Sequence, residues 1–425
     1  MSNSPTLHRL LYQLGVGAYC GAIRLASPIN SKAKAMVKGR KEVIETIKKE
    51  RKDGEKWVMI HTSSVGEFEQ ARPIIEWLHE NHPEYKICLT FFSSSGYEAL
   101  KNHPLVDIVT YLPFDNSSTL PEFIDLLAPQ FVLLIKYEFW LRMINLFHDR
   151  GIPILLVSAI FRTEQPFFKK RIGKLFRDAL HNFDTIFIQN KESEVLLQSI
   201  GLENYILSGD TRMDRVVHIK EKEEGLPEFA ALREKAIKQG KRIIIGGSTW
   251  DTDEKLLLEL ADKHSNLLLI LVPHEIGLQH LQRIIQHSPK EVTLFSQWDK
   301  GLDALPQLLL IDQMGLLSKL YRYADIAYIG GGFGKGIHNT IEPSVYGIPV
   351  IFGPRYQKFR EAKELIQTGG GFCIHSYSEL KEIVEHLLSN PQSLMNSGKA
   401  AEKVVYDNLG ATEVITSYLS SHYLK

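Results

Sequence analysis

Two glutamates in the first third of the chain have positions that suit acid–base chemistry. The first, Glu67, lies in HTSSVGEFEQARPII (61–75), where an apolar run ends, a turn of small residues follows and a helix is predicted to begin. N–H groups at a helix N-terminus favour an ionised carboxylate, which could accept a proton from a substrate. A first-turn glutamate that only complements the helix dipole would have the same pattern, and the residues alone favour that simpler interpretation.

The second, Glu138, lies in KYEFW (136–140), at the predicted end of a strand. A carboxylate beside Phe139 and Trp140 is unusual enough to suggest a function. Trp140 itself is more typical of core packing than of a substrate platform.

A glycine-rich segment, IGGGFGKGIHNTIEPSVYGIPVIFGP (329–354), has the composition of an anion-binding loop. We expect backbone N–H groups at Gly331, Gly332 and Gly334 to approach a phosphate, and a helix opening near His338–Asn339 to favour the anion. The segment is not a Walker A loop, because Gly follows its lysine where Ser or Thr is needed. A purely structural glycine turn is the alternative.

Two further features adjoin this loop. Glu342 could form hydrogen bonds with ribose hydroxyls. YQKFREA (356–362) directly follows the last predicted strand and places Lys358, Arg360 and Glu361 at a helix start. An ordinary solvated charged helix start is the alternative for this segment.

The sequence lacks the motifs of several other kinds of functional site. The sixteen histidines include no HExxH motif, and the spacing of His61, His274 and His338 is not that of metal ligands, so we expect no catalytic metal. No GxSxG motif occurs, so we expect no serine nucleophile of that type. Three widely separated cysteines fit a reducing compartment. Fifty basic and fifty acidic residues give no net charge, so we expect no nucleic-acid partner.

The elements that must position these residues form two series of apolar strands separated by helical stretches. The first series is predicted at 56–64, 85–93, 107–114, 130–139, 152–160 and 185–190, and the second at 241–248, 266–274, 291–296, 307–312, 325–332 and 348–354. Continuous apolar strands alternating with helices are typical of parallel sheets covered on both faces. The pattern therefore predicts an α/β protein with two Rossmann-like domains that face a central cleft, at 42–215 and 241–425, joined by a charged linker at 216–240.

The first 41 residues are different in character. They carry seven Lys and Arg residues and no Asp or Glu, and an apolar stretch of only fourteen residues lies between Arg9 and Arg24. That stretch is too short to span a bilayer, which takes about 20 residues. An apolar helix followed by a basic run suits an anionic membrane surface. A buried N-terminal helix with a solvated basic tail is the alternative.

SVGE, GDTRMD (209–214) and HNTIEP…GIPVIFGP, in this order, resemble one family: the bacterial 3-deoxy-D-manno-octulosonic acid (Kdo) transferases of lipopolysaccharide biosynthesis. TFFSSSG (90–96), YLPFD (111–115), FIQNKES (187–193), GGSTWDTDE (246–254) and VPHE (272–275) support the resemblance. It implies the GT-B glycosyltransferase fold with an N-terminal membrane-associated helix. It also implies inverting, metal-independent transfer of Kdo from CMP-Kdo to a lipid A precursor of the lipid IVA type. The expected location is the cytoplasmic face of the inner membrane, as a peripheral or monotopic protein without a cofactor.

Carried over residue by residue, the resemblance makes Glu67 the general base and Glu138 a second catalytic carboxylate. The donor-binding residues it implies are Pro273, His274, Gly331, Gly332, Phe333, Lys358, Phe359, Arg360 and Glu361, with Ser248, His338, Asn339 and Glu342 as further candidates. The sequence departs from the family at Lys136, where a Glu is common, at His274, where an Arg is common, and at Lys358, where an Asn is common.

Two other interpretations remain open at this point. The chain could be another GT-B glycosyltransferase or a sugar-nucleotide epimerase with a UDP-linked donor, because the late EP…GIPV pattern is shared loosely across that fold. It could also be a membrane-bound binding protein that has lost activity, although the glutamate in SVGE and the unbroken glycine loop speak against this.

Overall fold

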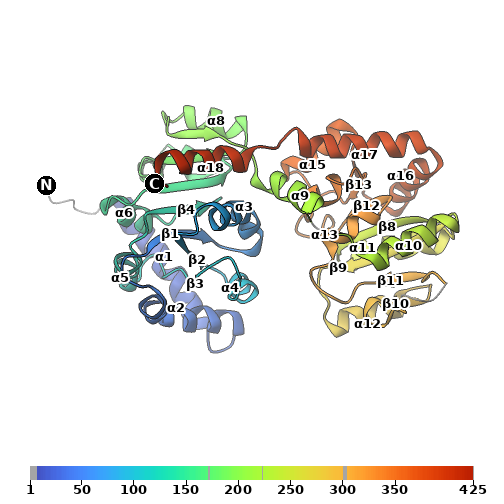
Figure 1. The fold of residues 1–425 in the computed structure, drawn as a ribbon, viewed down its shortest axis with the longest axis horizontal. Helices are drawn as coiled ribbons and strands as arrows, with labels where there is room; N and C mark the ends of the chain where they lie inside the picture. The colour runs from blue at the N-terminus through green and yellow to red at the C-terminus, as the bar shows by residue number, and fades with distance from the viewer. Residues whose placement is uncertain (1–6, 171–172, 223, 300–303, 425) are drawn as a thin grey trace. The chain divides into compact units, whose positions relative to one another are not determined.

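The computed structural model describes residues 7–170, 173–222, 224–299 and 304–424, with side chains from residue 10 onward. The chain divides into two compact units (Figure 1). The first comprises the chain up to Arg215 together with the residues from Leu409 onward, and the second comprises Val216–Asn408. Each unit is built around its own parallel sheet.

The sheet of the first unit has seven strands in the order β3-β2-β1-β4-β5-β6-β7. Their bounds are β1 Lys56–Thr62, β2 Tyr85–Phe91, β3 Ile108–Tyr111, β4 Phe131–Ile135, β5 Ile154–Ala159, β6 Thr185–Ile188 and β7 Tyr205–Leu207. Side chains alternate between two cores: Trp57 and Met59 of β1 face one, Val58 and Ile60 the other. All six predicted strands are confirmed, and burial on both faces explains their uninterrupted apolar runs.

Helices cover both faces of this sheet (Figure 1). They are α1 Leu7–Ala26, α2 Ser31–Glu50, α3 Val65–Asn81, α4 Ser94–Leu100, α5 Thr119–Leu127, α6 Leu141–Asp149, α7 Gly173–Leu180, α8 Lys191–Gln198 and α18 Ala411–His422, with a short 3₁₀ turn, η1, at Pro166–Phe168. Helix α9 (Thr211–Lys222) contains the boundary between the two units.

The second unit has the strand order β10-β11-β9-β8-β12-β13-β14. Its strands are β8 Arg242–Thr249, β9 Leu267–Pro273, β10 Val292–Leu294, β11 Leu308–Leu310, β12 Ile326–Ile329, β13 Val350–Phe352 and β14 Gly371–Cys373. Its helices are α10 Pro227–Lys238, α11 Asp251–Lys263, α12 Leu278–His287, α13 Leu317–Leu320, α14 Ile341–Ser344, α15 Arg360–Thr368, α16 Tyr377–Ser389 and α17 Pro391–Tyr406, with short 3₁₀ turns η2 Phe295–Gln297 and η3 Tyr321–Tyr323. The six strands predicted here are also confirmed, and the three-residue edge strands β7 and β14 were not predicted.

The predicted domain bounds need two corrections. Residues 409–425 were expected in the second domain, but α18 returns to the first unit, where Ile415 and Leu419 are fully buried beside α3 and the sheet (Figure 1, red on the blue and green unit). Residues 216–240 were expected to be a linker. They instead form the second half of α9 and helix α10, and Phe229 at 0% exposure belongs to the core of the second unit.

The N-terminal segment forms two helices. Helix α1 exposes Leu10, Leu11 and Leu14, which are 46%, 54% and 61% accessible. Helix α2 packs Val43 and Ile47 into the core. No helix among the described residues is both long enough and apolar enough to cross a membrane.

Candidate functional site

The two candidate glutamates come from adjacent positions in the sheet of the first unit. Strands β1 and β4 are parallel neighbours, and the strand order reverses between them. Ligands of open α/β sheets bind at such a reversal, outside the carboxyl ends of the strands. Glu67 follows the end of β1 and Glu138 follows the end of β4, so the topology brings to one place two residues that are 71 positions apart.

Local sequence explains the position of Glu67. Helix α3 begins at Val65 after Ser64, whose hydroxyl accepts a hydrogen bond from the Glu67 N–H at 3.4 Å. The Glu67 carboxylate in turn accepts a 2.5 Å bond from the N–H of Ser63. The predicted helix start is therefore confirmed, and the carboxylate is turned back toward the end of β1.

Glu138 is almost completely enclosed, at 5% exposure. Its Oε2 accepts hydrogen bonds from His61 Nε2 at 3.0 Å and from Trp140 Nε1 at 2.6 Å, and its Oε1 accepts one from the Ser63 hydroxyl. Burial by itself would raise the pKa of Glu138. The charge and hydrogen bond of His61, with the bonds from Ser63 and Trp140, outweigh burial and lower the pKa, so this carboxylate is held ionised.

Glu67 is shifted in the opposite direction. Burial, and after it the negative charge of Glu138, raise its pKa, and the bond from Ser63 only partly opposes the rise. The helix N-terminus was expected to favour the ionised form of Glu67, and that expectation is wrong in its net effect. When the pKa values of two neighbouring carboxylates are shifted in opposite directions, one can take up a proton while the other stays ionised, so the two can have different roles in acid–base catalysis.

His61 and Ser63 were not predicted as parts of this site. His61 is fully buried at the end of β1, and its Nδ1 lies 2.8 Å from the Thr90 hydroxyl and 3.1 Å from the Thr90 carbonyl oxygen. The available sequence signal was a histidine that follows four apolar residues near the end of the strand KWVMIHT. His61 holds the Glu138 carboxylate in place by a hydrogen bond, and Trp140 does the same. For Trp140, only a packing role was expected.

The loop that carries Glu138 has an unusual backbone. Lys136 adopts a φ of 67°, in the left-handed region that residues with a Cβ seldom occupy. Its N–H nevertheless keeps the ladder bond to Val157 at 2.9 Å. The chain thus turns sharply at the last hydrogen bond of the strand and brings Glu138 beside His61. Strain at such a position is common at functional sites.

In the second unit, the glycine loop follows β12, which is the parallel neighbour of β8 at the reversal of that sheet. Gly331, at a φ of 90°, donates its N–H to the Asp253 carboxylate at 2.9 Å, and the N–H of Gly334 donates to the Gly331 carbonyl at 2.9 Å. Both donors had been expected to face a phosphate. The backbone N–H groups of Gly332 and Phe333 have no acceptor within the described part of the chain and are among the donors that the loop can offer.

The loop packs too tightly for side chains. A Cβ on Gly332 would lie 2.6 Å from the backbone of Gly353, and one on Gly330 would lie 2.2 Å from the Ser248 carbonyl oxygen. Ser248 itself has a φ of 52°. The helix expected after the loop is only the four-residue α14, so a helix dipole adds little to anion binding here.

Three aromatic rings stack beside the loop. His274 stacks against both Trp250 and His338, with centroid distances of 4.8 Å and 4.4 Å. Trp250 Nε1 donates to His338 Nε2 at 3.2 Å, so that nitrogen carries no proton. Burial, followed by the charge of His274, lowers the pKa of His338 to about 4. Pro273 is buried at the end of β9 just before the stack, and Trp250 was not predicted as part of it.

The remaining predicted donor residues lie near the loop with differing contacts. The Phe359 ring lies against Gly336, where a Cβ would approach it to 3.1 Å. Arg360 forms hydrogen bonds with Glu364 at 2.7 Å and Asn408 at 2.9 Å. Lys358 is exposed, Glu361 is buried, and the Asn339 amide donates to Glu342 at 2.9 Å.

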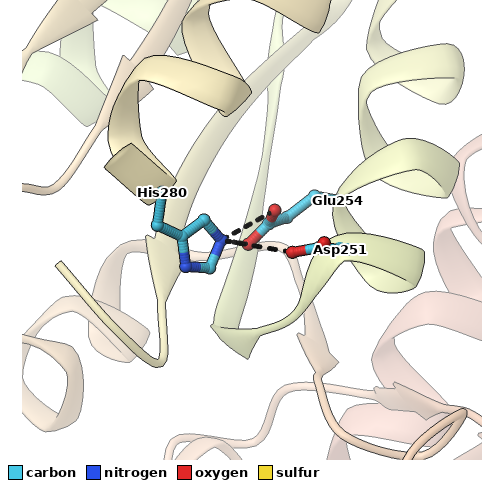
Figure 2. A group of neighbouring side chains, drawn as sticks. All are labelled: Asp251, Glu254 and His280. Atoms are coloured by element: carbon cyan, nitrogen blue, oxygen red, sulfur yellow. Dashed lines mark hydrogen bonds and ion pairs between the residues drawn. The ribbon is translucent and has the colours of Figure 1, made fainter. Parts of the chain in front are cut away.

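One cluster among the described residues has the side-chain types of a metal site: Asp251, Glu254 and His280 (Figure 2). His280 Nε2 lies 2.9 and 3.0 Å from the two Glu254 oxygens and 3.8 Å from Asp251 Oδ1. Arg283 donates to Asp251 at 2.8 Å, and this positive charge disfavours a cation. The cluster joins α11 to α12 by ion pairs, and sequence spacing did not suggest it because its members lie on two helices.

Two parallel-sheet units of this topology have the architecture of the GT-B fold, and the relatives described next indicate a glycosyltransferase. The family model described as 3-deoxy-D-manno-octulosonic-acid transferase (kdotransferase) matches residues 37–215. The transferase of this name from Aquifex aeolicus is 28% identical over 82% of this chain and 90% of its own length. The one from Haemophilus influenzae is 28% identical over 86% of this chain and 87% of its own length. This chain is therefore similar to Kdo transferases over most of its length.

Solved structures agree on the fold. A putative UDP-N-acetylglucosamine 2-epimerase from Listeria monocytogenes aligns with 87% of this chain and 97% of its own, at a TM-score of 0.59 and 15% identity. The UDP-GlcNAc 2-epimerase from Neisseria meningitidis aligns with 86% of this chain and 100% of its own, also at a TM-score of 0.59 and 15% identity. At these identities the likeness concerns architecture alone.

Proposed function

We propose that the chain transfers Kdo from CMP-Kdo to a lipid A precursor of the lipid IVA type in lipopolysaccharide biosynthesis, with inversion and without a metal ion. The observation that carries the proposal is the pair of glutamates at the β1/β4 reversal, both of which accept hydrogen bonds from Ser63, in a chain similar to the Kdo transferases. Their pKa values shift in opposite directions. One carboxylate can take up a proton while its neighbour stays ionised.

Glu67 is the general base of the proposed reaction. An acceptor hydroxyl oxygen forms a bond to the anomeric carbon of Kdo, the bond from that carbon to the CMP phosphate breaks, and its electron pair leaves with the phosphate. The hydroxyl proton passes to Glu67, whose raised pKa makes it a stronger base than an exposed glutamate. Glu138 remains ionised on His61 and maintains the raised pKa of Glu67.

The second unit holds the donor nucleotide in this proposal. The N–H groups of Gly332 and Phe333 would stabilise the charge that develops on the leaving phosphate, since fixed backbone dipoles stabilise an anion without rearrangement. His274 and Trp250 offer ring faces beside this loop. Lys358 and Phe359 adjoin it in the segment after β13.

Helices α1 and α2 would bind the anionic surface of the inner membrane on its cytoplasmic face. The exposed leucines of α1 provide the apolar contact, and the exposed lysines 32, 34, 38 and 41 of α2 provide positive charge. Arg40 does not take part. It is 7% exposed, its guanidinium lies 4.2 Å from the Phe114 ring centroid, and it donates to the Phe92 carbonyl at 2.9 Å.

The proposal is tested by transfer of labelled Kdo to a tetraacylated lipid A precursor, with CMP-Kdo generated in situ and EDTA present. We expect product with the wild type and its loss with Glu67→Gln. Glu69→Gln, a matched change two residues along the same helix, should retain activity. Absence of product with the wild type, together with binding of a UDP-sugar, would favour the alternative of a UDP-dependent glycosyltransferase or epimerase.

A further inference from the structure

A hollow of about 290 Å³ in the first unit lies outside the carboxylate site and has no role in the chemistry described so far. Four aromatic side chains line it: Tyr137, Phe139, Phe167 and Phe176. Arg162 and Gln165 are the polar residues at its wall, and the Arg162 guanidinium lies 5.6 Å from the Tyr137 ring centroid. The hollow is thus mostly aromatic, with one positive charge.

The wall of this hollow is part of the loop that carries Glu138. Tyr137 and Phe139 flank Glu138 in the sequence, and Phe139 packs edge-on against Phe167 at 4.7 Å between centroids. Burial raises the pKa of the Tyr137 hydroxyl, Arg162 opposes the rise and Glu67 adds to it. The Tyr137 ring therefore lies within electrostatic reach of both Arg162 and the candidate base.

Another residue that lines the hollow is in contact with α1. Phe176 lies edge-on to Tyr12 of that helix, with 6.4 Å between ring centroids. Tyr12 is fixed by its hydroxyl, which donates to Asp115 at 2.9 Å, while Leu11 and Leu14 of the same helix are exposed. Helix α1, which exposes these leucines, is therefore in ring contact with one side chain of the wall.

We propose that this hollow binds one acyl chain of the acceptor, and so positions its sugar hydroxyl at the paired glutamates. The inference rests on the proposed function, because it assumes a lipid acceptor. Aromatic walls favour an alkyl chain, and the charge of Arg162 complements an acceptor that carries phosphate. The contact of Phe176 with α1 lets the rest of the lipid stay at the apolar surface of that helix.

The test compares two acceptors, the tetraacylated precursor and the same disaccharide after deacylation, at constant detergent. For Phe176→Ala we expect the KM for the acylated acceptor to rise roughly tenfold, the effect of about two methylene groups losing their apolar contacts. The kcat should change less than twofold, and the deacylated acceptor should show no difference between variant and wild type. Phe168→Ala is the matched control, since Phe168 is a half-buried neighbour that does not line the hollow.

A second measurement does not depend on turnover. An acceptor with a photoreactive diazirine on one acyl chain should label peptides that contain Phe167 or Phe176, and Gln165→Trp, which fills the hollow, should abolish that labelling. Equal KM effects on both acceptors, or labelling confined to α1, would overturn the acyl-chain proposal. Absence of transfer by the wild type to either acceptor would instead overturn the proposed function.

Discussion

Replacement of Glu138 tests the carboxylate site most directly, because its carboxylate binds three donors at once. In Glu138→Ala, the imidazole of His61, which is fully buried, loses the acceptor of its Nε2–H, while Ser63 and Trp140 are only partly buried and can reach water. Removing one partner of a buried ion pair costs about 3–5 kcal/mol. Glu138→Gln should cost about 1 kcal/mol, because the amide oxygen can accept from His61 and the amide N–H can donate to the Ser63 hydroxyl.

Thermal unfolding of the full chain provides the assay, read at the transition of the first unit. For a unit of this size, about 1 kcal/mol corresponds to roughly 2–4 °C, so Glu138→Ala should lower its Tm by about 6–20 °C and Glu138→Gln by a few degrees. The lowered pKa of Glu138 means that its stabilisation is complete above the ordinary glutamate pKa of about 4.3 and is lost as pH falls through the folded value. The Ala penalty should therefore shrink as pH falls below the ordinary glutamate value.

The same replacement has a separate effect on activity. Because Glu138 contributes to the raised pKa of Glu67, Glu138→Gln should lower that pKa and move the acidic limb of the kcat/KM profile to lower pH. Equal Tm values for Glu138→Ala and the wild type would refute the buried anchoring on His61. An unmoved acidic limb in Glu138→Gln would refute the electrostatic coupling of the two glutamates.

Three further predictions concern single residues. Glu67→Gln should reduce kcat by about 10²–10⁴ and leave CMP affinity unchanged, as measured by single-turnover transfer and calorimetry. Gly332→Ala should lower the stability of the second unit by about 1–3 kcal/mol and weaken CMP binding, because the new Cβ would meet the backbone of Gly353; denaturant unfolding and CMP titration measure the two effects. The His338 pKa of about 4 lies below the ordinary value of about 6.5, so the unfolded chain takes up a proton first and the second unit loses stability as pH falls between these values. His338→Phe should remove that loss in denaturation curves recorded at pH 7 and pH 5.

Local pattern was sufficient for most of the fold and insufficient where packing was decided at long range. Twelve of the fourteen strands were predictable because Val, Ile, Leu and Phe runs leave few alternatives to a buried parallel strand. The strand β14, GFC, begins with glycine and has too few residues to form a pattern. Helix α18 is amphipathic, but nothing in its own residues specifies that Ile415 and Leu419 pack on the first sheet rather than the second.

The site shows the same division. Glu67 and Glu138 could be selected from their strand-end positions, and the start of α3 followed from the turn of small residues before it. The direction of the Glu67 pKa could not be obtained this way, because it depends on a glutamate 71 residues away. Likewise, the glycine loop suggested an anion site, yet the donation of the Gly331 N–H to Asp253, 78 residues earlier, decides which of its N–H groups remain available.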